Sequence, residues 1–152
     1  MSLPADANGR RAYGEELKAN PGFTSLVRLI EALLGEGGCP WDRSRKLEEC
    51  PKYLRGELDE VIAAIEAGDN ANLEEELGDL IFMLAFTIKL AEKEGRLEQT
   101  GVFKRILEKM VYRHPHVFGG EMEAGTPDEV LANWGELKKR EKATNGDMVD
   151  CD

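Results

Sequence analysis

The sequence lacks any long hydrophobic run and is poor in cysteine. No stretch approaches the ~18 consecutive apolar residues that a membrane-spanning helix needs, so we expect no transmembrane segment and no membrane partner. The three cysteines among 152 residues form no Cys-x-x-Cys pair, which argues against a disulfide framework and against a zinc ribbon. No signal peptide is visible at the N-terminus, and the expected location is therefore a reducing cytoplasm.

Basic residues are the minority of the charged side chains. Twenty Lys and Arg stand against thirty Asp and Glu, which leaves a formal net charge of -10. A surface with this charge repels phosphate backbones, so we expect no nucleic-acid partner. A small anionic ligand remains compatible with this charge if local cations or a divalent metal offset the carboxylates.

Strand patterns are sparse, whereas apolar residues recur at helical spacing. This pattern predicts an all-α helical bundle. The expected helices cover residues 23–34, 51–67, 72–94, 103–111 and 127–137. We interpret residues 23–142 as one helical domain, with flexible tails over residues 1–22 and 143–152.

The expected helix over residues 72–94 is more apolar than one buried stripe explains. Besides its core stripe it carries four large apolar residues on other faces: Phe82, Met83, Phe86 and Leu90. Such a helix is buried on several sides, either in the centre of a bundle or against another subunit. We therefore expect a homodimer or a higher homo-oligomer.

Two acidic patterns carry the most informative chemistry. Glu57 and Glu60 lie three residues apart in one expected helix, and Glu76 and Asp79 lie three residues apart in the next. At ~100° per residue, both pairs occupy the same arc relative to their apolar stripes, so they can face each other across a hairpin at Gly68. Converging carboxylates favour a magnesium or manganese site. The alternative is solvated acids in a Glu-rich chain, and the spacing alone does not decide between the two.

A second pattern is basic and aromatic. Lys109 and Arg113 lie four residues apart in one expected helix, as do Trp134 and Lys138 in the last one. The cations suit a polyphosphate, and the indole suits stacking on a base. Trp134 lies in an apolar stripe, where tryptophan is more often a core residue, and the alternative for the lysines is that they stabilise a helix C-terminus. The histidines that flank Pro115 form no Glu-x-x-His pattern, so a ferritin-like di-iron site is not indicated.

Four motifs together resemble the MazG-type nucleoside triphosphate pyrophosphohydrolases over about residues 23–142. In chain order they are Gly38-Cys39-Pro40-Trp41-Asp42, Glu57-x-x-Glu60, Glu76-Leu77-Gly78-Asp79-Leu80 and Arg113-His114-Pro115-His116-Val117-Phe118. The resemblance implies a dimeric all-α fold, Mg²⁺ dependence, and cleavage of a nucleoside triphosphate to monophosphate and pyrophosphate.

The resemblance also implies roles for individual residues. Carried over position by position, it assigns metal ligation and catalysis to Glu57, Glu60, Glu76 and Asp79. It assigns contacts with the nucleotide substrate to Lys109, Arg113, Trp134 and Lys138. Glu57 and Glu60 are both candidates for orienting or deprotonating the attacking water, and the sequence does not select one.

One departure from the family pattern concerns Gly56. The family commonly has two adjacent glutamates where this chain has Gly56-Glu57. Loss of the first glutamate bears on the number of metal ions, the attacking water and the choice of substrate. Glycine at this position also weakens the helix by about 1 kcal/mol relative to alanine. Two alternatives therefore stay open. One is a related pyrophosphohydrolase specific for dUTP, dCTP or a modified nucleotide, and the other is a non-catalytic helical oligomerisation or regulatory module.

Overall fold

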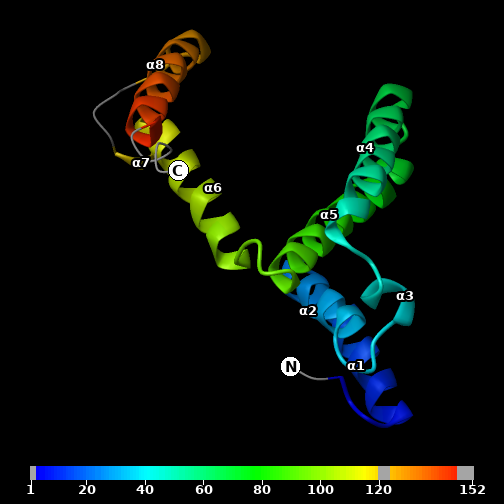
Figure 1. The fold of residues 1–152 in the computed structure, drawn as a ribbon. Helices are drawn as coiled ribbons and strands as arrows, with labels where there is room; N and C mark the ends of the chain where they lie inside the picture. The colour runs from blue at the N-terminus through cyan, green and yellow to red at the C-terminus, as the bar shows by residue number, and fades with distance from the viewer. Residues whose placement is uncertain (1–2, 120–123, 147–152) are drawn as a thin grey trace. The chain divides into compact units, whose positions relative to one another are not determined.

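The structure is a computed structural model that describes residues 3–119 and 124–146 (Figure 1). These residues form helices and contain no β-strand, so the prediction of an all-α fold is confirmed for them. The chain divides into two compact units, residues 1–99 and 100–152. Within the described ranges, no helix is both long and apolar enough to cross a membrane.

The first unit consists of five α-helices and one short 3-10 helix. They are α1 (Ala7–Ala19), α2 (Phe23–Leu34), α3 (Pro40–Arg43), η1 (Leu47–Glu49), α4 (Cys50–Ala67) and α5 (Asn70–Lys93). In Figure 1, α4 and α5 run side by side as a hairpin, and α2 packs on α5. The second unit contains most of α6 (Gln99–Arg113), together with α7 (Pro115–Phe118) and α8 (Pro127–Gly146).

Helix α1 lies within the segment for which the sequence predicts a tail. The Asp6 side chain caps it by accepting a hydrogen bond from the Gly9 amide at 2.8 Å, and Leu17 is buried. Glu16 pairs with Arg28 of α2 at 2.9 Å. The structure differs here from the expected tail because long-range contacts hold a helix whose apolar pattern is weak. The domain boundaries at residues 23 and 142 stay a prediction.

The α4–α5 hairpin depends on a two-residue connection. Gly68 ends α4 in the left-handed conformation, with φ 67°, which glycine adopts without steric cost. Asp69 then caps α5, because its side chain accepts a hydrogen bond from the Asn72 amide at 3.1 Å. A connection this short makes the two helices antiparallel neighbours, as the spacing of the acidic pairs requires.

The core of the first unit lies where α2, α4 and α5 meet. Ile30 is fully buried, Leu90 is 1% exposed, and Phe86 and Cys50 pack with them. Phe86 and Leu90 are two of the four residues on which the expected subunit contact rests. The bundle-centre alternative is correct for both, so they carry no argument for an oligomer.

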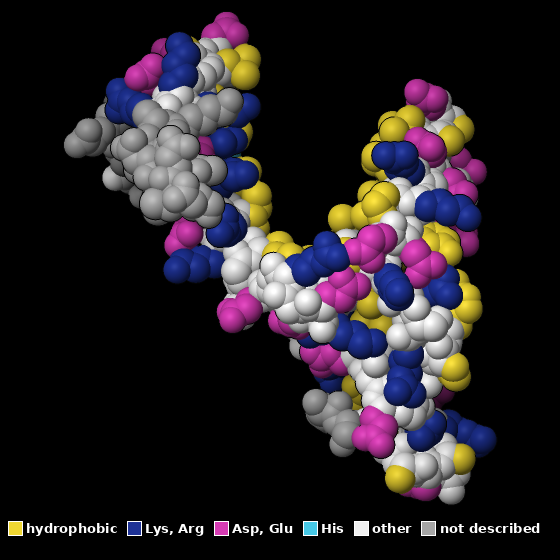
Figure 2. Space-filling view, viewed as in Figure 1, with side chains coloured by type: hydrophobic (Ala, Val, Ile, Leu, Met, Phe, Trp, Pro, Cys, Tyr) yellow, Lys and Arg dark blue, Asp and Glu magenta, His cyan; other side chains and the backbone are white. Residues whose placement is uncertain are grey.

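A different set of apolar side chains reaches the surface of the hairpin (Figure 2). These residues recur at three- to four-residue spacing, were expected to be core, and are 41–59% exposed: Leu58, Ile62 and Ile65 of α4, and Leu77, Ile81 and Leu84 of α5. Exposed apolar surface of this extent is uncommon on monomeric proteins.

In the second unit, α8 begins with a capping box. Glu129 Oε2 accepts hydrogen bonds from the Gly125 and Thr126 amides at 2.8 and 3.1 Å, and Thr126 Oγ1 accepts one from the Glu129 amide at 3.3 Å. This is the start that the sequence predicts. The helix continues to Gly146, into the expected C-terminal tail, and residues 147–152 lie outside the described residues.

Candidate active site

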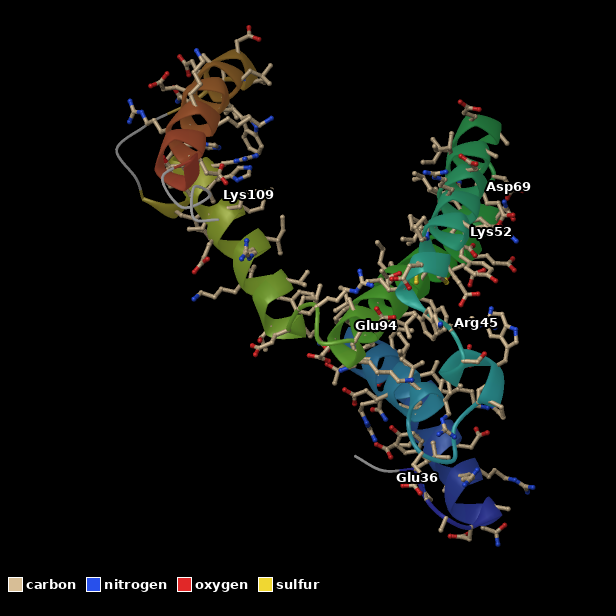
Figure 3. All side chains as sticks on the ribbon, viewed as in Figure 1. Glu36, Arg45, Lys52, Asp69, Glu94 and Lys109 are labelled. Atoms are coloured by element: carbon tan, nitrogen blue, oxygen red, sulfur yellow. The ribbon has the colours of Figure 1, made fainter. Side chains whose placement is uncertain are left out.

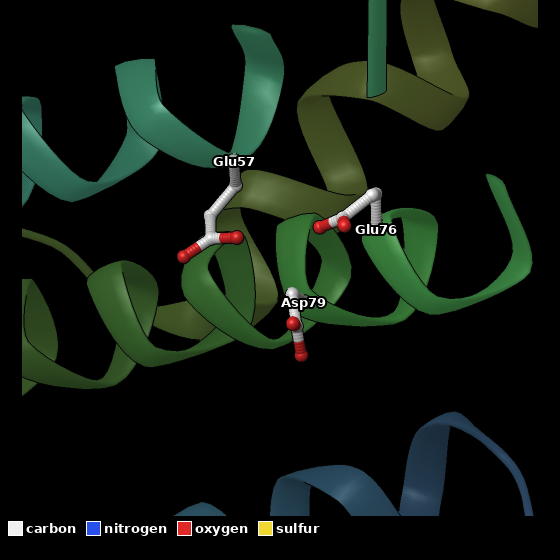
Figure 4. Close-up of side chains that lie close together, drawn as sticks. All are labelled: Glu57, Glu76 and Asp79. Atoms are coloured by element: carbon white, nitrogen blue, oxygen red, sulfur yellow. The ribbon is translucent and has the colours of Figure 1, made fainter. Parts of the chain in front are cut away.

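Three of the four predicted carboxylates meet on the α4–α5 hairpin (Figure 4). Glu57 comes from α4, and Glu76 and Asp79 come from α5. Each offers one carboxylate oxygen, and the three oxygens lie within 4.8 Å of one another. The turn at Gly68 brings them together, because it places the middle of α4 opposite the first half of α5.

The fourth carboxylate, Glu60, stands outside this group of three. It is exposed on α4, one turn after Glu57. Its charge nevertheless contributes to the raised pKa of both Glu57 and Glu76, so it lies beside the group. All four predicted acids are therefore neighbours, but Glu60 borders the cluster rather than completing it.

The crowding changes the acidity of two members. Partial burial is the main cause that raises the pKa of Glu57, followed by the negative charges of Asp79 and Glu60. Loss of solvent also raises the pKa of Glu76, and the neighbouring carboxyl group of Glu60 and the charges of Glu75 and Asp79 raise it further. Both shifts oppose ionisation, and a bound cation would reverse them.

The donor set fits a hard divalent cation. Carboxylate oxygens are the ligands that Mg²⁺ and Mn²⁺ prefer, and Mg²⁺ binds oxygen at about 2.0–2.1 Å. Oxygens on opposite sides of such an ion are about 4.2 Å apart. The three oxygens lie within 4.8 Å of one another, which is close to this separation.

An aromatic cleft adjoins the carboxylates, and sequence reasoning did not assign it. Its cavity volume is about 50 Å³. Its lining combines apolar and charged side chains: Trp41, Asp42, Arg45, Lys46, Glu49, Cys50, Tyr53, Phe82, Met83 and Phe86. Tyr53 lies one turn before Glu57 on α4, and Met83 lies one turn after Asp79 on α5. The cleft therefore continues the face of the hairpin that carries the acids.

Trp41 stands at this cleft because of the loop that precedes it. A Cβ on Gly38 would lie 2.3 Å from the carbonyl oxygens of Ala32 and Leu33, so only glycine fits there. The Trp41 side chain is 56% exposed, and the Arg45 guanidinium (labelled in Figure 3) lies 4.5 Å from its ring centroid. An exposed tryptophan beside a tight glycine turn was the available signal for this cleft.

The second unit gathers three of the four predicted nucleotide contacts. The Arg113 guanidinium lies 5.7 Å from the ring centroid of Trp134, and the Lys138 ammonium lies 5.9 Å from it. Trp134 is half-buried, and the His114 ring meets it edge-on with centroids 5.0 Å apart. Lys109, labelled in Figure 3, is exposed one turn before Arg113. We call Arg113, Trp134 and Lys138 the cation cluster.

The cation cluster also has an acidic neighbour that the sequence patterns did not reveal. Glu141 of α8 pairs with Arg113 of α6, 28 positions away, at 2.6 Å from Nη2. A pair so distant in the sequence leaves no periodic signal, so only the packing of α6 and α8 identifies it.

Comparison with known proteins agrees with this architecture. The sequence model of the family described as the MazG nucleotide pyrophosphohydrolase domain matches residues 45–118 of this chain. The nucleoside triphosphate pyrophosphohydrolase of Escherichia coli K12 is 39% identical over 108 residues, which cover 71% of this chain and 41% of that protein. The uncharacterized protein YabN of Bacillus subtilis is 37% identical over 123 residues, covering 81% of this chain and 25% of that protein.

A solved structure extends the similarity to the fold. The crystal structure of a mazG-related protein from Thermotoga maritima has 30% sequence identity and a TM-score of 0.68. The match covers 77% of this chain and 99% of that one. This chain spans only a quarter to two fifths of the first curated relatives, which are longer proteins. With the domain match and the shared fold, the chain belongs to the MazG family.

Proposed function

We propose that this chain hydrolyses nucleoside triphosphates to nucleoside monophosphate and pyrophosphate, with Mg²⁺ or Mn²⁺ as cofactor. The observation that carries the proposal is the group of carboxylate oxygens of Glu57, Glu76 and Asp79 within 4.8 Å of one another. Its support is the family membership and a relative named nucleoside triphosphate pyrophosphohydrolase.

The chain's acids have two tasks in this reaction. Glu57, Glu76 and Asp79, with Glu60 beside them, would hold the metal. A bound Mg²⁺ neutralises charge on the phosphates and lowers the pKa of a coordinated water. Glu60 stands outside the group of three but close enough to influence Glu76, so it is the side chain left to orient the attacking water. We expect Glu60→Gln to lower kcat more than it weakens metal binding.

The aromatic cleft holds the base of the nucleotide in this proposal. Tyr53 and Glu57 are one helical turn apart, about 6 Å along α4, which a nucleotide readily spans. The exposed indole of Trp41 offers a face for stacking, and the charged rim offers hydrogen-bonding groups. Trp41→Ala should change the ratio of kcat/KM between bases, whereas Trp41→Phe should largely preserve it.

The cation cluster and Lys109 contribute contacts with the substrate. Cations balance the charge of a triphosphate, and the Arg113 guanidinium can donate two hydrogen bonds to one phosphate as a bidentate donor. Trp134 has Arg113 and Lys138 within 6 Å of its ring centroid, so we assign it the task of holding these cations. This differs from stacking on the base, the role that the sequence pattern suggests for it.

The chain also forms a homodimer or higher oligomer in this proposal, through a second copy of the hairpin. The support is the exposed aliphatic surface that includes Ile62 and Ile81, rather than Phe86 and Leu90. We expect light scattering to give at least twice the mass of one chain, and Ile81→Glu to reduce it. A monomer at micromolar concentration contradicts this part of the proposal. The cytoplasmic location remains a prediction.

The decisive experiment is pyrophosphate release from a panel of nucleotides. The panel contains the common ribo- and deoxyribonucleoside triphosphates, with dUTP, dCTP and modified bases, each assayed with Mg²⁺, Mn²⁺ or a chelator. Asp79→Asn should abolish release, and Asp59→Asn, a matched exposed acid on α4, should leave it intact. Orthophosphate and the nucleoside diphosphate as the first products would refute the proposed reaction.

The same panel separates the alternatives. Turnover confined to dUTP, dCTP or a modified nucleotide identifies a specific pyrophosphohydrolase. Binding of metal without turnover of any nucleotide identifies a non-catalytic helical module.

A further inference from the structure

The ion pair between Arg113 and Glu141 is less exposed than the other ion pairs among the described residues of the second unit. Glu141 Oε2 accepts a hydrogen bond from Arg113 Nε at 2.8 Å and lies 2.6 Å from Nη2. The two side chains are only 16% and 20% exposed, against 56% and 48% for the Arg140–Glu136 pair. Solvent-exposed pairs contribute little, whereas a shielded pair with two short contacts fixes geometry.

The guanidinium of Arg113 is held from two directions. Glu141 engages its Nε and Nη2 atoms, and the ring of Trp134 lies 5.7 Å from its central carbon. A guanidinium carries five N–H donors in a planar fork. The contacts with Glu141 use the edge of the guanidinium formed by Nε and Nη2. A second anion can therefore be bound on the side of Nη1.

The charge of the group still favours an anion. Arg113 and Lys138 flank the same indole and bring two positive charges, against the one negative charge of Glu141. Glu141 therefore lowers the cost of keeping Arg113 partly shielded from water without cancelling the positive charge. An arginine already fixed by an ion pair also loses less side-chain entropy when a phosphate binds.

We propose that Glu141 is a positioning residue, which orients the Arg113 guanidinium so that its Nη1 side receives a phosphate group of the substrate. The inference rests on the proposed function only in taking that phosphate to belong to a nucleoside triphosphate. If Glu141 instead occupied the phosphate site as a competing anion, its removal would tighten phosphate binding.

The test measures binding of inorganic triphosphate with Mg²⁺ by calorimetry, which does not depend on turnover. We expect Glu141→Ala to weaken binding roughly tenfold, as expected for loss of a charge-assisted contact. Glu141→Asp should restore part of the affinity. Glu136→Ala removes an exposed acid of the same helix and should leave affinity unchanged.

A double-mutant cycle separates positioning from a general structural role. If Glu141 acts through Arg113, Glu141→Ala adds no further loss of affinity in the Arg113→Ala background. A structural role predicts an additional loss in that background. Thermal unfolding of each variant identifies any that fails to fold, and Glu141→Asp then provides the comparison.

The outcomes distinguish this inference from the proposed function. Triphosphate binding that depends on Glu141 in a chain that releases no pyrophosphate supports the inference and refutes the proposed function. Pyrophosphate release with triphosphate binding that is unchanged or tighter in Glu141→Ala refutes the inference alone. A wild-type chain that binds no triphosphate also overturns the inference, because Arg113 then has no phosphate to receive.

Discussion

Neutralising Asp79 should stabilise the metal-free chain and abolish its stabilisation by metal. Asp79→Asn removes one negative charge and keeps the size of the side chain. Asp79 is exposed on α5, and its charge is one of the causes that raise the pKa of Glu57. Without a cation, the substitution relieves repulsion between carboxylates that folding brings together.

The distance between the carboxylates sets the size of this effect. Two unit charges at 4.8 Å, the limit within which the oxygens lie, repel by about 0.9 kcal/mol in water and about 3.5 kcal/mol at an effective dielectric constant of 20. Because Asp79 is exposed, water screens the pair, and the lower value applies. A gain of about 1 kcal/mol in a domain of this length raises Tm by about 2–4 °C.

Added Mg²⁺ should reverse which of the two proteins, wild type or Asp79→Asn, has the higher Tm. A ligand at ten times its Kd stabilises the folded state by about 1.4 kcal/mol. The wild type gains this stabilisation, whereas in Asp79→Asn a neutral amide replaces one of the three carboxylates that define the site. We therefore expect the Tm of the wild type to be higher than that of the variant in Mg²⁺ and lower than that of the variant in chelator.

The assay is thermal unfolding followed by circular dichroism, in chelator and across a Mg²⁺ titration. Asp59→Asn removes an exposed charge from α4 outside the cluster and serves as the control. It should show the same rise of Tm with Mg²⁺ as the wild type. A lower Tm for Asp79→Asn in chelator, or an undiminished response to Mg²⁺, would refute the assignment of Asp79 to a metal site.

Three further predictions concern the fold around the site. Burial raises the pKa of Glu57, so the folded protein holds this proton more tightly than the unfolded chain does. The resulting contribution to stability is complete below the ordinary glutamate pKa and is lost as the pH rises through the raised pKa of the folded state. In chelator, the stability of Glu57→Gln relative to wild type should therefore grow with pH, as denaturant titrations from acid to neutral pH can measure. Gly56 lies mid-helix with open space around its Cβ position, so Gly56→Ala should raise the free energy of unfolding by about 1 kcal/mol, and an unchanged or lower value in urea titrations contradicts this. Leu90 is 1% exposed, so Leu90→Ala should cost about 2–5 kcal/mol by the same method, whereas Leu131→Ala, at a position 70% exposed, should cost far less.

Local signals in the sequence determined much of the secondary structure. Gly68 ends α4 in the left-handed conformation, and the Thr126–Glu129 capping box begins α8. These features could be predicted because a cap depends on residues within one turn of the helix end. The spacing of Glu57 and Glu60 likewise identified one acidic face of α4, since helical periodicity is a property of neighbouring residues.

Only the tertiary structure decided which apolar face is buried. Helix α5 is apolar on several sides, and periodicity does not tell which side meets a neighbour. Phe86 and Leu90 face α2 and α4 in the core, whereas Ile81 and Leu84 reach the surface. Two of the four residues on which the prediction of an oligomer rests, Phe86 and Leu90, are therefore buried within one chain.

Long-range packing also decided the contents of the site. Glu60 shares the acidic face of α4 but lies outside the three-carboxylate group, because its position relative to α5 depends on how the helices pack. Helix α1 buries Leu17 and contacts α2 through the Arg28–Glu16 pair despite its weak pattern, and Glu141 reaches Arg113 across 28 positions. Such contacts join residues that no local period relates, so packing, and not spacing, selects the partners.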